Sequence, residues 1–400
     1  MTTDETRLLR RRMHAQFGPA GPRRALSDGP ASSGGPASSD DGASSGGPGE
    51  PGGPGRPGAV VAVAGRAAGI QAQDAAAARL GLRARGVATA AEADAAYRSG
   101  EVVASWLMRG TLHLVPAVDL PWLLRIFGAR NLAAGAGRRR RLGLTDEICE
   151  RAVALLPEVL SAPLSRAALV SALIDRGVEV DPAGQAPAHL VGYAAARGLL
   201  CRGAEVAPRE PGYVLLPGPP PGPPEPPGPP GKADLAALAV RYLAAFGPAG
   251  AADLAAWSGL PLTVCRRAVE AAGLPEVAQG LFAGPGAGAA LPEDGPEDGP
   301  EVRLLGAYDN YLLGYRDRTA MLDPAFARRI NAGGGVIHPA LVADGRVLGR
   351  WAADRARGSV TVRVEPFGPL PGPVRERLRA EAAAVGRFLG LAAELRIARP

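Results

Sequence analysis

Apolar positions along the chain repeat with either a helical or a strand-like period, and low-complexity stretches separate the periodic segments. Asp74 and Thr89 stand where helix N-caps are expected. Two strand-like runs flank a short turn that contains Arg109 and Gly110. In the first third, the pattern predicts helices over Glu5–Phe17, Ala75–Arg85, Ala90–Arg98 and Val118–Phe127, and strands over Val102–Leu107 and Thr111–Val115.

The same order of elements recurs in the middle of the chain. Thr145 and Ser165 each precede a helical segment, and a third helix is expected over Ala183–Arg197. Leu199–Arg202 and Tyr213–Leu216 are the predicted wing strands, with Gly203–Gly212 as the wing loop. Three short helices with helix-turn-helix spacing follow, over Asp234–Phe246, Gly250–Trp257 and Leu262–Ala272. Helices followed by a hairpin are typical of winged-helix modules, so we expect tandem units of this kind.

The last hundred residues change to strand-like patterns. Asp344-Gly345 is a hairpin turn signal, and Pro373 stands at the start of a helix predicted over Val374–Leu391. Strands are predicted over Val302–Leu305, Gly335–Ile337, Ala340–Val342, Val347–Trp351 and Ser359–Glu365. The expected fold class is therefore α+β and helix-rich, with tandem winged-helix (helix-turn-helix) units and a C-terminal lobe that contains β-strands.

Segments poor in large apolar side chains mark the domain boundaries. Residues 18–58 are rich in Gly, Pro and Ser and are predicted to be disordered, because they cannot bury enough surface to offset ordering. Residues 217–231 form a Pro-rich, semi-rigid linker, and residues 284–300 a low-complexity loop. The ordered parts are then an N-terminal helix (1–17), three winged-helix or helix-turn-helix units (59–142, 143–216 and 232–283) and the C-terminal lobe (301–400).

Composition allows a polyanion partner without requiring one. The chain of 400 residues has a formal net charge of +6, and its basic residues are arginines apart from Lys232. Cys149, Cys201 and Cys265 are widely spaced and form no CxxC motif, so we expect neither a disulfide framework nor a zinc site. This use of cysteine suits a reducing cytoplasm. The N-terminus lacks a signal-peptide pattern, and no uninterrupted apolar run is long enough for a membrane span.

Two motifs carry the functional interpretation. Gln71 and Gln73 stand two residues apart ahead of a predicted helix, and Trp106–Leu114 contains the Arg-Gly turn. This pairing is similar to the N-terminal signature of a winged-helix DNA-binding family whose characterised members are the AlkZ-like and YcaQ-like alkylpurine DNA glycosylases. The Gln-x-Gln form resembles the AlkZ-like branch, although the middle residue, usually a larger hydrophobe, is Ala72 here. Leu304–Arg318 and Asp344–Trp351 resemble further family motifs.

The resemblance implies that Gln71 and Gln73 are catalytic. An amide is a poor general base near neutral pH, but it offers both an acceptor and a donor and can therefore hold a water. A held water suffices when the leaving group is already activated, and alkylation at N7 or N3 gives a purine a positive charge. Without the resemblance, two glutamines before a helix are solvated residues with no special role. Asp74 is interpreted as an N-cap rather than an acid–base partner.

Arginines are the candidate DNA contacts. Arg109 lies beside the proposed site and is either a phosphate ligand or part of a structural ion pair. Arg316 and Arg318 lie in a family-like motif and are counted as DNA-binding candidates. The run Arg138, Arg139, Arg140 and Arg141 follows a Gly/Ala-rich segment read as a turn, and it either contacts phosphates or forms a solvated face. His113 lies in an apolar strand and is expected to be a packed histidine.

The sequence thus predicts a cytoplasmic, monomeric, winged-helix DNA-binding protein. We expect a monofunctional DNA glycosylase that hydrolyses the N-glycosidic bond of cationic alkylated purines in double-stranded DNA, without metal, small-molecule cofactor or membrane. The alternative is a non-catalytic DNA-binding protein or transcriptional regulator built from the same modules.

Overall fold

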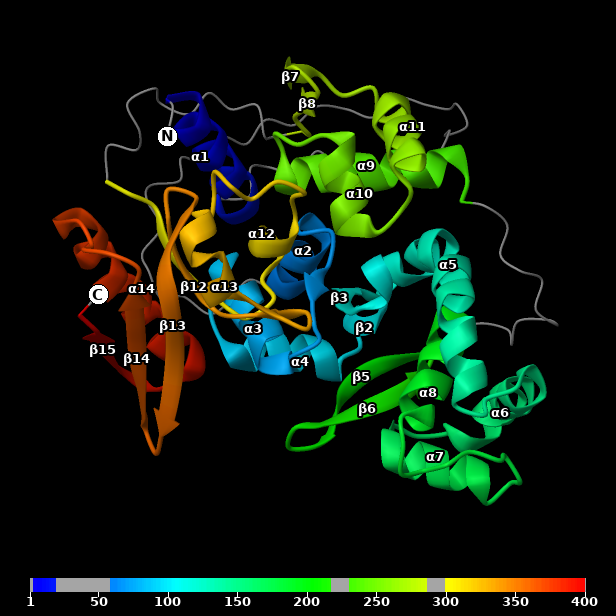
Figure 1. Cartoon of the computed structure of the whole chain (residues 1–400). Coiled ribbons are helices and arrows are strands. Elements are labelled where there is room, and N and C mark those ends of the chain that lie inside the picture. Colours follow the sequence, from blue (N-terminus) through cyan, green and yellow to red (C-terminus); the bar gives the residue numbers. More distant parts are fainter. Residues whose placement is uncertain (1–2, 19–57, 217–229, 286–298, 400) are drawn as a thin grey trace, which may run out of the picture.

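The computed structural model describes residues 3–18, 58–216, 230–285 and 299–399. The predictions for residues 18–58, 217–231 and 284–300 fall largely outside these ranges. Helices and strands alternate through most of the described chain, and helices surround two larger sheets, one of six strands and one of five (Figure 1). Two further sheets have two strands each. The mixed, helix-rich composition agrees with the predicted α+β class, whereas the division into winged-helix units stays a prediction.

The N-terminal elements have the caps that the sequence predicts. Asp74 accepts a hydrogen bond from the Ala77 N–H, and Thr89 accepts one from the Glu92 N–H. The elements up to the first hairpin are α1 (Thr3–Phe17), α2 (Ala59–Arg66), β1 (Ile70–Gln71), α3 (Ala75–Ala84), α4 (Ala90–Arg98), β2 (Val102–Trp106), the 3-10 turn η1 (Met108–Gly110) and β3 (Leu112–Pro116).

After a short 3-10 turn, η2 (Ala117–Asp119), comes a helix that is much longer than predicted. Helix α5 (Leu120–Arg141) runs through the Gly/Ala-rich segment that the sequence indicated as a turn. Gly128 approaches the Ala196 carbonyl closely, and α5 packs along α8 (Ala186–Ala196). Alanine is the strongest helix former, and this packing offsets the cost of Gly135 and Gly137. The arginine run therefore ends a helix rather than following a turn, which corrects the prediction.

The second group of elements joins the first in one sheet. Helices α6 (Asp146–Val159) and α7 (Arg166–Ile174) begin after the predicted caps Thr145 and Ser165. Strand β6 (Glu210–Leu215) pairs with both β4 (Leu164–Ser165) and β5 (Leu200–Ala207). The predicted wing loop over Gly203–Gly212 is wrong, because both strands continue through it and leave only a tight turn. The six-stranded sheet has the order β1-β3-β2-β5-β6-β4, with β2 and β5 meeting at Ala104 and Arg202.

Helices α9 (Lys232–Phe246), α10 (Ala251–Ser258) and α11 (Leu262–Ala272) confirm the next three predicted helices. They are followed by β7 (Glu276–Ala278) and β8 (Leu281–Phe282), a short pair that the sequence pattern did not indicate. The Tyr242, Phe246 and Trp257 rings pack together inside this group. The group covers one face of β2 and β3, where Val103, Leu107 and Val115 belong to the same buried cluster.

The C-terminal lobe contains a five-stranded sheet in the order β15-β14-β13-β12-β9. Two of its strands, β13 and β14, are longer than predicted and form a projecting hairpin (Figure 1). The final strand β15 pairs in parallel with β14 and was not predicted. The elements are β9 (Val302–Leu305), α12 (Asn310–Leu313), η3 (Pro324–Phe326), α13 (Ala327–Ile330), β10 (Asn331–Gly333), β11 (Val336–Ile337), β12 (Ala340–Ala343), β13 (Arg346–Ala356), β14 (Ser359–Pro366), α14 (Gly372–Leu389) and β15 (Ala392–Ile397).

Helix α3 anchors this lobe to the N-terminal elements. Arg83 forms a buried ion pair with Glu381 of α14 at 2.8 Å and donates to the Leu304 carbonyl of β9. Phe388 of α14 joins the apolar cluster beneath α2, α3 and α4. Because α3 follows the two glutamines directly, residues from both ends of the chain meet beside them. In the described ranges, no helix is long and apolar enough to cross a membrane.

Candidate active site

The two glutamines lie at the edge of the six-stranded sheet. Gln71 is the second residue of β1, pairs with His113 and is only 7% exposed, whereas Gln73 is exposed in the short segment before α3. Successive side chains of an extended segment point to opposite faces, so Ala72 points away from both glutamines. Both residues lie ahead of α3, as predicted, and Gln71 also belongs to a short strand that was not predicted.

Each amide is held through its oxygen. The Arg109 guanidinium donates to Gln71 Oε1 at 3.1 Å. The Leu112 backbone N–H donates to Gln73 Oε1 at 3.1 Å, so the Gln73 side chain occupies the place that a continuing strand would take beside β3. These contacts fix both oxygens and leave each amide NH2 group as a donor. Both amides are thus oriented at one edge of the sheet.

Arg109 is held in an unusual backbone conformation. Its φ of 54° lies in the left-handed region, where a non-glycine residue is uncommon. The guanidinium also donates to the Trp257 carbonyl at the end of α10. Gly259 makes this approach possible, because a Cβ there would lie 3.2 Å from Arg109 Cγ. Desolvation and the charge of Arg318 lower the pKa of Arg109 to about 10, so it remains cationic at neutral pH.

A row of polar side chains crosses the sheet beside Arg109. Gln71 of β1, His113 of β3 and Ser105 of β2 are directly opposite one another in register and therefore share a face. His113 is 1% exposed, and its Nδ1 lies 2.9 Å from the Thr111 carbonyl, which can only accept. Burial, together with the charge of Arg109, lowers the pKa of His113 to about 3. The imidazole is therefore neutral and packed, as expected from the sequence.

The other residue considered for acid–base chemistry is already occupied. Asp74 Oδ1 accepts the Ala77 N–H at 2.8 Å and caps α3. This confirms its interpretation as an N-cap. The pair of glutamines is thus flanked by a capping carboxylate, a neutral histidine and a cationic arginine.

The four arginines at the end of α5 differ in their burial and in their contacts. Arg139 is buried, donates to the Leu132 carbonyl and lies over the Tyr193 ring at 4.8 Å. Arg138 donates to Gln185 Oε1 at 2.7 Å. Arg140 and Arg141 are exposed and form no ion pair with any described residue. Because Arg139 is sequestered inside, it is removed from the candidate DNA contacts.

Arg316 and Arg318 lie after α12. The Arg316 side chain is exposed, while its backbone N–H donates to Asp253 Oδ1 at 3.0 Å. Arg318 Nε donates to the Tyr315 carbonyl at 3.2 Å, and desolvation lowers its pKa. Its charge reaches Arg109, although the two residues are more than 200 positions apart in the sequence. Arg109 and Arg318 therefore form a cationic pair beside Gln71, with no carboxylate partner among the described residues.

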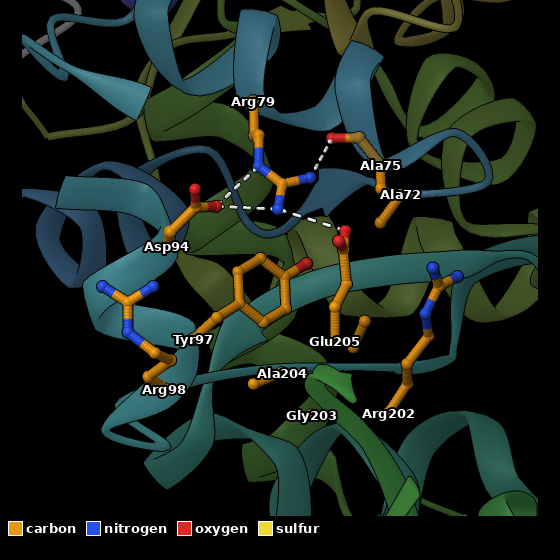
Figure 2. Close-up of a pocket in the computed structure, with 11 residues that line it drawn as sticks. Ala72, Ala75, Arg79, Asp94, Tyr97, Arg98, Arg202, Gly203, Ala204 and Glu205 are labelled. Atoms are coloured by element: carbon orange, nitrogen blue, oxygen red, sulfur yellow. Dashed lines mark hydrogen bonds and ion pairs between the residues drawn. The ribbon is translucent and has the colours of Figure 1, made fainter. Parts of the chain in front are cut away.

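A pocket of about 150 Å³ opens on the opposite face of β1, between α3, α4, β2 and β5. Figure 2 shows Arg79 bridging Asp94 at 2.7 Å and Glu205 at 3.2 Å across this pocket. Ala72 lines it, and the two glutamines do not. The pocket therefore belongs to the seam between the two halves of the sheet, and Arg79 pairs with both of its carboxylates. No described cluster of His, Cys, Asp or Glu has the composition of a metal site.

Comparison with known proteins identifies the family. The model of a family described as DNA glycosylase AlkZ-like matches residues 64–388. This chain belongs to the AlkZ-like DNA glycosylase family. It is 29% identical over 358 residues, or 82% of its length and 90% of the relative's, to an interstrand DNA cross-link repair glycosylase from Streptomyces sahachiroi. It also resembles the structure of Streptomyces sahachiroi DNA glycosylase AlkZ, with a TM-score of 0.68, 25% identity, and coverage of 85% of this chain and 94% of that one.

Membership of the family makes this AlkZ-like chain a DNA glycosylase and a DNA-binding protein. It does not assign roles to individual residues. Sequence reasoning missed two contacts at the site: the bond from Arg109 to Gln71, and a set of bonds from Asn310 to the backbone of β1. Asp309 and Asn310 stand inside a family-like motif, but nothing in their spacing indicated what they contact.

Proposed function

We propose that Gln71 and Gln73 together hold the water that hydrolyses the N-glycosidic bond of a cationic alkylated purine. The water oxygen bonds to C1′ of the sugar while the bond from C1′ to the purine nitrogen breaks. The bonding electron pair goes to the purine and neutralises its positive charge, and the water releases a proton to solvent. The products are a free base and an abasic site, as in a monofunctional glycosylase.

The observation that carries this proposal is the fixed orientation of both amides, which are themselves poor general bases. Arg109 and the Leu112 N–H hold the two oxygens, and Asp74 is engaged as a cap. Such a site orients a water but does not generate a strong nucleophile, so it acts only on a leaving group that is already activated. Alkylation at N7 or N3 of a purine provides that activation.

Arginines are proposed to hold double-stranded DNA around the site. Arg109 contacts Gln71, and the charge of Arg318 reaches Arg109. Arg316 is exposed after α12, and Arg140 and Arg141 lie at the exposed end of α5. The Arg109 guanidinium has further donors, so it can contact a phosphate while it keeps its bond to Gln71 Oε1. The Gln71 NH2 group then remains the donor that is available to the water.

One observation favours the alternative of a DNA-binding protein without catalysis at these residues. Gln71 is only 7% exposed and its oxygen is engaged with Arg109, so little of its side chain is open to solvent in the free protein. In that case the protein would bind DNA but release no base. A relative named as an interstrand DNA cross-link repair glycosylase makes a cross-linked duplex a second substrate to test.

The deciding experiment measures release of free base from duplex DNA containing N7-methylguanine under single-turnover conditions. Gln73→Ala and Gln71→Ala are each expected to slow excision by roughly 10²-fold, the scale of losing an oriented catalytic contact. The double variant should lose less than the product of the two effects, because both amides act on one water. DNA affinity should change little, since phosphate contacts dominate it. Binding without release by the wild-type protein would establish the alternative, and full excision by both variants would overturn the assignment of the glutamines.

A further inference from the structure

The outer edge of β1 is paired with a side chain instead of a strand. In β1, Ile70 and Gln71 pair with β3, and Ala72 N–H donates to the Leu112 carbonyl on the same side. The Gln71 N–H and the Gly69 carbonyl face the other side. There, Asn310 Oδ1 accepts from the Gln71 N–H at 3.0 Å, and Asn310 Nδ2 donates to the Gly69 carbonyl at 2.5 Å. The amide thus makes the two hydrogen bonds that a neighbouring strand would make.

Asn310 is itself fixed by a buried network. It is 3% exposed and begins α12 directly after Asp309. Both carboxylate oxygens of Asp309 accept from Arg85 at 2.9 Å, and these two side chains are almost fully buried. Arg85 also donates to Gln16 Oε1 of α1 at 2.6 Å. Residues from the N-terminal helix, from α3 and from the C-terminal lobe therefore converge on the residue that holds β1.

We infer that Asn310 is a positioning residue for Gln71, which it places for catalysis by clamping the outer edge of β1. The inference rests on the proposed function, in which Gln71 holds the hydrolytic water. Strand β1 has only two residues, so its pairing with β3 alone defines its position weakly. A slip by one residue would turn the Gln71 side chain to the other face of the sheet. Even a small misplacement of a residue that orients a reactant is costly in rate.

Asn310→Asp tests the clamp through its protonation state. The protonated carboxyl offers one acceptor and one donor, like the amide, whereas the ionised carboxylate cannot donate to the Gly69 carbonyl. Burial and the neighbouring Asp309 raise the pKa of such a carboxyl, while Arg85 is already engaged with Asp309. His113 stays neutral because its pKa is about 3, and Arg109 stays charged because its pKa is about 10. Neither group therefore titrates over the range of the experiment.

Single-turnover excision by Asn310→Asp, relative to wild type at the same pH and corrected for spontaneous depurination, is the readout. It should be reduced about tenfold or more at about pH 8 and should recover to within about threefold at about pH 5.5. Asn310→Ala should be slow at every pH. Tyr311→Phe is the matched control, because it removes a buried hydrogen bond of 2.9 Å to the Gly345 carbonyl next door without touching β1. The inference would be overturned if the excision rate of Asn310→Asp relative to wild type did not depend on pH. It would also be overturned if Tyr311→Phe slowed excision as much as the Asn310 variants do.

Amide hydrogen exchange gives a readout that does not depend on activity. In Asn310→Ala, the Gln71 N–H should exchange at least about tenfold faster than in wild type, while the Ala72 N–H, bonded to β3, remains protected. Equal protection of Gln71 in both proteins would contradict the clamp even if the wild type excised no base. If the wild-type protein excises no base, but the Gln71 N–H still loses protection in Asn310→Ala, only the proposed function is refuted.

Discussion

At the scale of single residues, Arg109 is the centre of the candidate site. It adopts a left-handed conformation at the hairpin turn and donates both to Gln71 and to the end of α10. Such a backbone conformation costs free energy and persists only where surrounding contacts impose it. The Arg109 side chain links the sheet edge that carries the glutamines to the helices that cover the sheet.

Arg109→Lys should slow excision about tenfold, because an ammonium cannot make the two-branched contact of a guanidinium. The charge is retained, so DNA affinity should change little. Single-turnover release of N7-methylguanine measures the effect. Arg125→Lys is the control, since Arg125 pairs with Asp234 at an exposed surface position. An unchanged rate in Arg109→Lys would mean that the bond to Gln71 is not needed for catalysis.

His113 should make the protein less stable in acid. Its pKa is lowered from 6.5 to about 3 by burial and by Arg109, so between these values the unfolded chain binds a proton that the native protein does not. The free energy of unfolding should then fall as the pH falls, by up to about 1.4 kcal/mol per pH unit from this group. Urea unfolding of wild type and His113→Asn from about pH 7 to about pH 5 measures the slope. Identical slopes for the two proteins would show that His113 is not protected from protonation.

At the scale of elements, helix α5 places its four successive arginines in different environments. Four successive arginines on a helix point in different directions, and the pattern of partners follows from that rotation. Arg139 turns inward onto Tyr193, and Arg140 and Arg141 face solvent. Gly135 leaves room for the Arg139 guanidinium, since a Cβ there would lie 2.6 Å from one of its nitrogens.

This division gives opposite expectations for two variants. The double variant Arg140→Ala/Arg141→Ala should have a shallower plot of log affinity for duplex DNA against log salt concentration, with the magnitude of the slope reduced by about one to two. Its thermal stability should be unchanged. Arg139→Ala should leave the salt dependence unchanged and should destabilise the fold by roughly 1–3 kcal/mol, because a buried hydrogen bond and a cation–π contact are lost. Salt titrations and thermal unfolding of both proteins test this. The assignment fails if the double variant keeps the wild-type salt dependence.

At the scale of the whole molecule, the C-terminal lobe and the N-terminal elements meet at α3. The pair of Arg85 and Asp309 is almost completely buried where α1, α3 and α12 join. The nearby pair of Arg83 and Glu381 is also buried and links α3 to α14. Breaking one partner of such a pair leaves a buried charge uncompensated, which costs more than removing both.

A double-mutant cycle at this junction should therefore be strongly non-additive. Asp309→Ala alone is expected to destabilise the protein by about 3–5 kcal/mol, because Arg85 remains buried without its partner. Adding Arg85→Ala should cost much less than the sum of the single effects. Denaturant unfolding of the four proteins gives the coupling free energy. Additive effects would show that the two side chains do not stabilise the junction as a pair.

Local patterns in the sequence predict most of the helices and the hairpin strands. Asp74 and Thr89 cap their helices as expected, and β9 has the predicted bounds. These features depend on neighbouring residues, which the sequence records directly. The length of α5, the tight β5–β6 turn and the final strand β15 were not predicted, because each depends on pairing or packing with distant segments.

The sequence by itself determined the caps, the periodic elements, the Gln-x-Gln motif and its family resemblance. Only the tertiary structure decided which groups surround that motif. Arg109 reaches Gln71 from the hairpin turn, and Asn310 reaches it from the far end of the chain. The charge of Arg318 reaches Arg109. The tertiary structure also buries Arg139 and thereby gives it a different role from its neighbours in the run. The physical reason is that a capping residue acts over three or four positions, whereas a contact between Gln71 and Asn310 exists only once two distant segments have packed together.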